Sequence, residues 1–376
     1  MNVRDLRHDL LARPEPEQES RQRAVVALRR IVSGRLRARN LPAYEAEALP
    51  AYRAARASEP ETREEIAQAL FLSPGYRTWS ALARASQEMI WLTVGEPVLR
   101  QQERIAEAAH RFGNGAQQGA GGSLAFDPAF EPVAEIADID IHLQPGGYAL
   151  ERHGEDWLAG ALYEAGGNIY AFGQGIGKAD SKAGAVMRHL EQVRPGFAPA
   201  RILEIGCSAG AASCAWALAF PEAEVHAVDI GAGMLRYAHA RAEALGARVH
   251  FHQADAAALS RFEDGGFDLV VSHNLLHEIG RDKRRAMMRE AHRLVAPGGL
   301  VVHQDVPTRF VEGEVAQVER AWDVRFNGEA FWSIYAGDDL LADMCEAGFA
   351  PERVAQLRLE KTDGRGGWYL LEGQAG

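Results

Sequence analysis

Apolar runs and stretches of helical periodicity alternate along the second half of the chain. Five short apolar runs predict strands, at residues 202–205, 224–228, 249–253, 267–272 and 300–304. Segments with helical spacing separate them, as in a parallel sheet whose strands are joined by crossover helices. Two more apolar runs, 353–359 and 368–371, flank a turn at 362–367 and predict a hairpin. The pattern therefore predicts an α/β fold in which a parallel sheet is closed by an antiparallel C-terminal hairpin.

The first 125 residues have a different, mainly helical pattern. Apolar residues recur at helical spacing between residues 18 and 37 and again between residues 76 and 112, where Pro97 is expected to start a new helix. Thr62 and Glu65 have the spacing of a capping box in front of a further helix. These faces are too apolar for a free tail, so we expect residues 1–125 to pack on another part of the molecule.

Residues 126–195 form a third segment between the helices and the sheet. A glycine-rich linker at 112–123 precedes it, and the alternating run ADIDIHL at 137–143 predicts a short strand. A cluster of glycines at Gly173, Gly175 and Gly177 follows. No strand precedes this cluster, so it is not interpreted as a nucleotide-binding loop.

Composition and charge narrow the function classes. The chain has 376 residues, enough for two domains, and a net charge of −11, which argues against a broad nucleic-acid interface. Its three cysteines lack paired or metal-type spacing, which favours a reducing, cytoplasmic setting. No apolar stretch is long enough to span a membrane. The expected partners are therefore neither nucleic acid nor membrane.

The first predicted strand of the sheet runs into a loop of small residues, RILEIGCSAGAAS at 201–213. As a dinucleotide fingerprint it is imperfect, because Ser208 and Ala211 replace glycines. As a nucleophile elbow, G-x-S-x-G, it lacks the upstream strands of a hydrolase. A purely structural turn is a third interpretation. The fourth is a loop whose glycines let the backbone pass close to a ligand.

Several motifs in this half resemble those of the class I S-adenosylmethionine-dependent methyltransferases. Glu204, Gly206 and Gly210 match the first motif, from which Ser208 departs, and Asp229 ends the second strand. The resemblance covers residues 196–376 and implies a Rossmann-like sheet. It implies S-adenosylmethionine as cofactor and S-adenosylhomocysteine as product. The predicted hairpin favours this family over a nicotinamide-binding fold.

The resemblance also implies a set of cofactor-binding residues. Asp229 would accept hydrogen bonds from both ribose hydroxyls, and Asp255 would receive the adenine amino group beside Ala256. Tyr170 and Lys178 lie where family members fold a segment over the cofactor. The full set of expected cofactor contacts is Glu204, Gly206, Cys207, Ser208, Gly210, Asp229, Ile230, Met234, Asp255, Ala256, His273 and Tyr170.

Candidate catalytic groups follow the fourth and fifth predicted strands. His277 and Glu278 follow the fourth strand, and His303 and Asp305 end the fifth. These strands are neighbours in the family's sheet, so the four side chains can converge. Methyl transfer mainly requires positioning, and a histidine can also act as general base. The alternative is that these histidines only pack or form structural hydrogen bonds.

Two further functions remain open at this point. His277, Glu278 and His303 are the ingredients of an open metal site, which looks like the arrangement in metal-dependent α-keto acid C-methyltransferases. The chain can instead be a catalytically silent S-adenosylmethionine-binding protein that acts as a dimer partner. The preferred interpretation is a cytoplasmic methyltransferase of small-molecule metabolites, a homodimer without a metal.

The stretch at 306–336 is expected to be an insertion on the substrate side of the sheet. Its aromatic residues suggest either an apolar substrate wall or a packed lid helix. Arg309 or Arg325 can pair with a substrate carboxylate. The helices of residues 1–125 would then cover the pocket or form the dimer. The aromatic residues are Phe310, Trp322, Phe326, Phe331, Trp332 and Tyr335.

Overall fold

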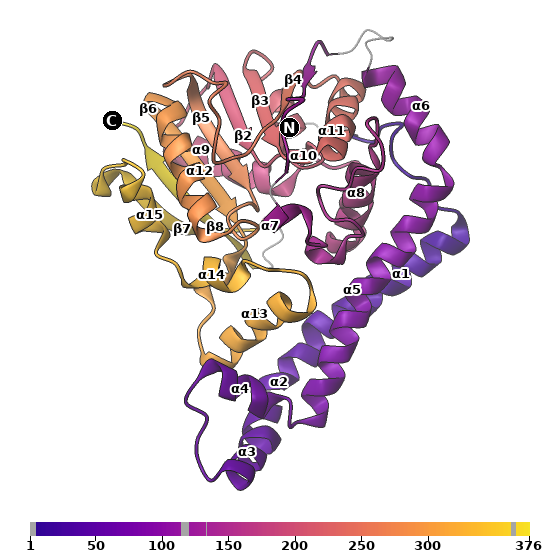
Figure 1. Ribbon diagram of the computed structural model, residues 1–376, viewed down its shortest axis with the longest axis vertical. Coiled ribbons are helices and arrows are strands. Elements are labelled where there is room, and N and C mark those ends of the chain that lie inside the picture. Colours follow the sequence, from indigo (N-terminus) through magenta and orange to yellow (C-terminus); the bar gives the residue numbers. More distant parts are fainter. Residues whose placement is uncertain (1–4, 114–119, 133, 362–365) are drawn as a thin grey trace.

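The computed structural model describes residues 5–113, 120–132, 134–361 and 366–376, and its centre is one eight-stranded sheet (Figure 1). The strand order is β1-β4-β3-β2-β5-β6-β8-β7, and only β8 runs antiparallel to its neighbours. The five predicted parallel strands and the closing hairpin are confirmed, although residues 362–365 of its turn lie outside the described residues. The strands are β1 Ser123–Ala125, β2 Arg201–Ile205, β3 Glu224–Asp229, β4 Val249–Gln253, β5 Phe267–His273, β6 Val295–Asp305, β7 Val354–Glu360 and β8 Gly367–Gln374.

Apolar side chains cover both faces of the sheet, which explains the continuous apolar runs of its central strands. On one face, Ile202 and Val302 pack against helices α9 (Ser181–Val193), α10 (Ala211–Ala219) and α11 (Ala232–Leu245). On the other face, Leu203 and Val301 pack against α12 (Arg281–Leu294) and α15 (Leu340–Glu346). The result is a three-layer α/β domain, as the sequence pattern predicts.

The N-terminal residues form the predicted helical extension. In Figure 1 the long helix α5 runs beside α1 from the tip of the molecule toward the sheet. At the tip, the extension packs on α13 of the 306–336 insertion, where the Trp79 and Trp322 rings lie 5.2 Å apart. The elements of the extension are α1 Pro16–Arg30, a π turn Ile31–Leu36, a 3-10 turn Arg37–Arg39, α2 Asn40–Ala43, a π turn Tyr44–Ala48, α3 Leu49–Arg56, α4 Arg63–Leu70, α5 Pro74–Arg100 and α6 Gln102–Gly113.

The remaining elements connect these two parts. Helix α8 contacts both α5 of the extension and α11 of the sheet domain. The 3-10 turn at Ile141–Leu143 also lies against α5. These elements are α7 Ala134–Ala137, the 3-10 turn Ile141–Leu143, α8 Leu158–Tyr170, a 3-10 turn Pro307–Phe310, α13 Glu314–Phe326, α14 Trp332–Gly337 and a 3-10 turn Pro351–Arg353.

Two local predictions are wrong, and one strand was not predicted. Residues 137–143 are not a strand, because α7 ends at Ala137 and His142 has left-handed backbone geometry, with φ of 56°. Pro97 does not start a helix, since it lies in the last turn of α5. The edge strand β1 was not predicted, and residues 114–119 of the expected linker lie outside the described residues.

The Thr62–Glu65 capping box is confirmed. Within the described residues, no helix combines the length and the apolar composition needed to cross a membrane.

Candidate active site

Backbone hydrogen bonds hold the loop between β2 and α10 against the neighbouring strand β3. The N–H groups of Gly206 and Cys207 both donate to the Val228 carbonyl, at 2.8 and 3.0 Å. Gly206 has a φ of +74°, and a Cβ there would lie 2.7 Å from the Leu275 side chain. Ser208, with φ of 48°, continues the left-handed path. The loop therefore passes close to the cavity without side-chain bulk at Gly206.

Asp229 ends β3 with its carboxylate held in place by backbone donors. Its Oδ2 accepts a hydrogen bond from the Ser208 N–H at 2.8 Å, and its Oδ1 accepts one from the Gly231 N–H at 2.9 Å. Burial raises the pKa of this carboxyl above its usual range. The Ile230 backbone also stabilises the carboxylate, whose two oxygens offer about four lone-pair sites in all. This geometry suits recognition of a ligand with two neighbouring hydroxyls.

A cavity opens above the carboxyl ends of the strands and brings together seven of the predicted residues. The order β4-β3-β2-β5 places Asp255 and Asp229 on one side of the Gly206 loop and Glu278 on the other. Asp255 also forms an ion pair with Lys283. The predicted residues that line the cavity are Gly206, Ser208, Asp229, Ile230, Asp255, Ala256 and Glu278, and His142, Tyr148, Tyr163 and Asn274 line it as well.

The other expected cofactor contacts lie behind this lining. The Glu204 carboxylate accepts a hydrogen bond from Ser213 Oγ at 2.5 Å, and burial raises its pKa to about 8. His273 Nε2 receives the Trp216 indole N–H at 3.1 Å, and burial lowers its pKa to about 4. Cys207, Gly210 and Met234 belong to the buried loop and core, and the Tyr170 hydroxyl contacts the Gln87 amide.

Three of the four predicted catalytic residues meet beside the cavity. His277 Nδ1 lies 2.5 Å from Asp305 Oδ1, and His277 Nε2 lies 3.3 Å from Glu278 Oε1. All three side chains are buried. His303 lies outside this group, because its Nδ1 hydrogen bonds with Ser272 Oγ at 2.8 Å, and burial lowers its pKa to about 4.

The same array continues into two residues that sequence reasoning missed. His142 Nε2 lies 3.1 Å from Glu278 Oε1, and His142 Nδ1 lies 2.5 Å from Glu329 Oε1. The Tyr148 hydroxyl donates to Glu278 Oε1 at 3.2 Å. His142 was hidden in a run predicted as a strand, and Glu329 lies between α13 and α14 without any motif. The carboxylates and histidines thus form the array Asp305–His277–Glu278–His142–Glu329.

The position of His142 depends on the helical extension. Its carbonyl accepts hydrogen bonds from the Gln87 side-chain amide and the Trp91 indole of α5, each at 2.6 Å. On the opposite side, a Cβ at Gly328 would lie 2.5 Å from the Asp140 carbonyl oxygen. The extension and the insertion therefore both fix the backbone that presents His142 and Glu329.

Opposite charges within the array shift the pKa values of its members. Burial alone would lower the pKa of His277, but the Asp305 and Glu278 carboxylates outweigh it and hold this pKa well above the usual value. Burial would also lower the pKa of His142, which Glu329 and Glu278 raise instead. Burial opposes ionisation of Glu278, yet the two imidazoles keep its pKa well below the usual range. Burial raises the pKa of Glu329.

The predicted aromatic insertion divides into two parts. The rings of Trp332 and Tyr335 lie 5.1 and 6.0 Å from the His277 ring, so they border the array. Trp322 and Phe326 instead pack in the cluster with the N-terminal helices. Arg309 Nη1 donates to the Tyr335 carbonyl at 2.5 Å, and Arg325 is exposed.

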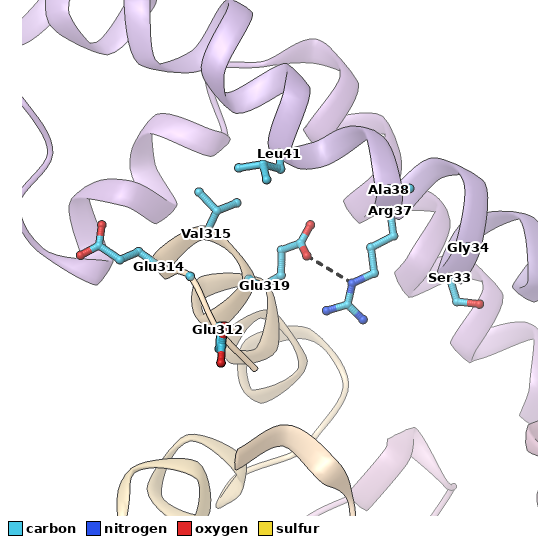
Figure 2. A pocket seen from close by; sticks show the side chains of 11 residues that line it. Ser33, Gly34, Arg37, Ala38, Leu41, Glu312, Glu314, Val315 and Glu319 are labelled. Carbon is cyan, nitrogen blue, oxygen red and sulfur yellow. Dashed lines mark hydrogen bonds and ion pairs between the residues drawn. The ribbon is translucent and has the colours of Figure 1, made fainter. Parts of the chain in front are cut away.

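A second hollow, of about 520 Å³, lies between the N-terminal helices and α13 (Figure 2). In this view Arg37 and Glu319 point toward one another, and their Nε and Oε2 atoms are 3.2 Å apart. Leu41 and Val315 also border the hollow. Its lining contains none of the residues of the glycine loop or the array, so this hollow lies apart from the predicted cofactor and catalytic residues.

Comparisons with known proteins agree with the motif pattern. Residues 202–299 match the family described as methyltransferase domain. The malonyl-[acyl-carrier protein] O-methyltransferase of Geobacter sulfurreducens is 33% identical over 197 residues, which cover 49% of this chain and 70% of that protein. The demethylmenaquinone methyltransferase of Thermus thermophilus is 37% identical over 110 residues, 29% of this chain and 49% of that protein.

Among solved structures, the chain is similar to phosphoethanolamine N-methyltransferase 2 of Haemonchus contortus in complex with S-adenosyl-L-methionine. The identity is 16%, the match covers 50% of this chain and 51% of that chain, and the TM-score is 0.38. Apart from the Geobacter protein, the chain spans about half or less of the length of the curated relatives named here and of several others.

Proposed function

Because the chain belongs to the class I S-adenosylmethionine-dependent methyltransferases, we propose that it transfers a methyl group from this cofactor to a small-molecule acceptor. Family membership rests on the Geobacter relative, of which the chain covers 70% at 33% identity, and on the strand order of the sheet. S-adenosylmethionine is therefore its cofactor. The acceptor and the atom that receives the methyl group belong to the proposal.

The observation that carries the proposal is the placement of Asp229 and Glu278 in one cavity, on opposite sides of the glycine loop. We place the ribose hydroxyls on the Asp229 carboxylate, whose two oxygens are preoriented by Ser208 and Gly231. The adenine then lies beside Asp255 and Ala256. This orientation directs the methionine end of the cofactor along the Gly206 loop, toward Glu278 and His142.

The side chains around Glu278 support the proposal of a small acceptor. His142 and Tyr148 line it, and Trp332 and Tyr335 pack on His277 behind it. Methyl transfer is an in-line displacement at an activated carbon, so catalysis consists mainly of holding acceptor and methyl within reacting distance. The array offers polar groups that can orient an acceptor there. The role of His277 as general base stays a prediction.

Binding of S-adenosylhomocysteine by isothermal titration calorimetry tests the cofactor part of this proposal. Asp229→Ala removes the acceptor of both ribose hydroxyls, so we expect at least about tenfold weaker binding. Glu222→Ala changes an exposed acid on the turn before the same strand and serves as the control. Unchanged affinity in Asp229→Ala would show that the cofactor does not bind in this cavity.

Turnover separates an enzyme from the silent binding protein that the sequence left open. Release of S-adenosylhomocysteine is measured with panels of small phenols, amines and carboxylic acids. Cofactor binding without release for any acceptor class would favour the silent partner. The homodimer and the cytoplasmic location expected from the sequence also stay predictions, and sedimentation analysis of the full chain tests the first.

A further inference from the structure

We propose that His142, His277, Glu278 and Glu329 bind one divalent transition-metal ion at the edge of the cofactor cavity. One ligand atom from each of these side chains can be chosen so that all four lie within 4.8 Å of one another. They come from the 3-10 turn at Ile141–Leu143, the loop after β5 and the loop between α13 and α14. The set differs from the metal alternative considered from the sequence, in which His303 took the place of His142 and Glu329.

The ligand types select the class of metal. Two imidazole nitrogens with one or two carboxylates suit first-row ions such as Fe²⁺, Mn²⁺, Co²⁺ or Zn²⁺, whereas all-oxygen sites suit Mg²⁺ or Ca²⁺. Two histidines and one carboxylate on one side of an ion leave coordination positions open. Glu278 and Glu329 together supply up to two carboxylates.

The orientation of His277 is that of a metal ligand held by a second carboxylate. Its Nδ1 faces Asp305 Oδ1 at 2.5 Å, which leaves Nε2 directed at Glu278 and the rest of the cluster. Asp305 is itself fixed, because its Oδ2 accepts the Leu276 N–H at 2.7 Å. Histidine ligands in proteins commonly pair their other ring nitrogen with a carboxylate in this way.

An unsatisfied atom gives an independent reason to expect a cation. The Glu329 side chain is only 4% exposed, and its Oε2 is buried without a hydrogen-bond partner. Burying a carboxylate oxygen without a partner is costly, and a metal ion would satisfy it. Binding of the ion would require the coordinating imidazole nitrogens to be deprotonated.

The location links the site to the reaction. His142 and Glu278 line the cofactor cavity, so an ion held by them would lie beside the space assigned to the acceptor. This step rests on the proposed function. It identifies the acceptor as a molecule with two adjacent oxygen donors, able to chelate the ion while the methyl group is transferred.

Titration with Co²⁺ tests the site without any need for a substrate. Full-length protein without a polyhistidine tag is treated with chelator, and Co²⁺ is followed by calorimetry and visible absorption. We expect one equivalent per chain, with binding weakened at least about tenfold in His277→Ala and, separately, in Glu329→Gln. His153→Ala and Glu155→Gln change the same residue types at exposed positions and should bind as the parent protein does.

Three outcomes would overturn the metal site. They are the absence of stoichiometric Co²⁺ binding, binding that survives both site variants, and equal loss in the exposed controls. S-adenosylhomocysteine affinity is measured on every variant, and we expect it to stay within about threefold of the parent value because these residues do not hold the ribose. A failure of the cofactor assignment is thus seen separately, in Asp229→Ala. If one site variant does not fold, the other still decides the question.

Discussion

The two sides of the cavity are held together by different kinds of contact. On the β3–β4 side, backbone N–H groups of Ser208 and Gly231 hold Asp229, and all of these residues lie within a short stretch of adjoining loops. On the β5–β6 side, His142, Glu278 and Glu329 hold one another through side chains that come from three distant segments. The first side is held by backbone groups of loops that follow the strands. The second side also depends on how the extension and the insertion pack, because they fix the backbone at His142 and Glu329.

The largest effect should come from breaking the buried ion pair between α12 and Asp338, which follows α14 just after the insertion. Arg284 of α12 is fully buried, contacts Asp338 and donates to the Leu276 carbonyl at 3.3 Å, next to His277. Asp338→Ala leaves this guanidinium without its carboxylate, which should lower the free energy of unfolding by about 3 kcal/mol or more. Urea denaturation measures it, with the exposed Asp282→Ala as control. A loss below about 1 kcal/mol would contradict a tight junction.

The junction between α8 and the sheet domain should show up in the pH dependence of stability. Glu164 contacts Arg241, His8 and Tyr237, and these partners outweigh burial and lower its pKa to about 2 from 4.5. The ionised form is favoured by folding, so this stability is present above pH 4.5 and is lost as the pH falls toward 2.

The shift of the Glu164 pKa corresponds to at most about 3 kcal/mol. We therefore expect Glu164→Gln to lower stability at neutral pH and to flatten its decline between pH 4.5 and 2. Denaturant titrations across that range measure it, and Glu107→Gln, on an exposed face of α6, is the matched control. An equally steep decline in Glu164→Gln would contradict the assignment.

Gly328→Ala should separate the two sides of the cavity most clearly. The new Cβ would lie 2.5 Å from the Asp140 carbonyl at a φ of +73°, so the backbone that presents Glu329 and His142 has to move. We expect a loss of about 2 kcal/mol in stability and weaker Co²⁺ binding, with unchanged S-adenosylhomocysteine affinity. Gly337→Ala, where a Cβ meets nothing within 4 Å, is the control. A parallel loss of cofactor affinity would show that the two sides are not independent.

The smallest expected effect concerns the support of His142 by α5. Trp91→Phe keeps an aromatic ring against Gly166 but removes the indole N–H that donates to the His142 carbonyl. Gln87 still donates to the same oxygen, so the loss should be about 1 kcal/mol in urea denaturation. Loss of Co²⁺ binding together with normal stability would show that the orientation of His142, rather than stability, depends on this bond.

The same division explains what the sequence could predict. The sheet was predictable because its strands are buried on both faces, and the place of Asp229 at the end of a strand followed from its distance to the first motif. The strand β1, three residues long, is too short to leave a pattern. His142 was missed because the alternation of Ile139 and Ile141 with aspartates fits a strand, whereas hydrogen bonds from α5 impose a turn.

Glu329 could not be predicted for a related reason. It lies in a connection whose position is set by contacts with Asp140 and with the N-terminal helices, far away in the sequence. The spacing of apolar residues around Glu329 cannot indicate contacts with segments so distant in the sequence. The proximity of His277 and Asp305 could be predicted because they follow neighbouring strands. His303 was expected to join them, but it lies outside the array because its ring hydrogen bonds with Ser272.

The spread of the array along the chain has a consequence during biosynthesis. His142 leaves the ribosome well before His277 and Glu278, and Glu329 emerges after both. Synthesis proceeds from the N-terminus. A nascent chain therefore contains the residues of the cofactor-binding loops before it contains every residue of the array. A prematurely terminated product ending before Glu329 would retain Asp229 and Asp255 yet lack the last member of the cluster, so only polypeptides that extend beyond Glu329 contain all four proposed ligands.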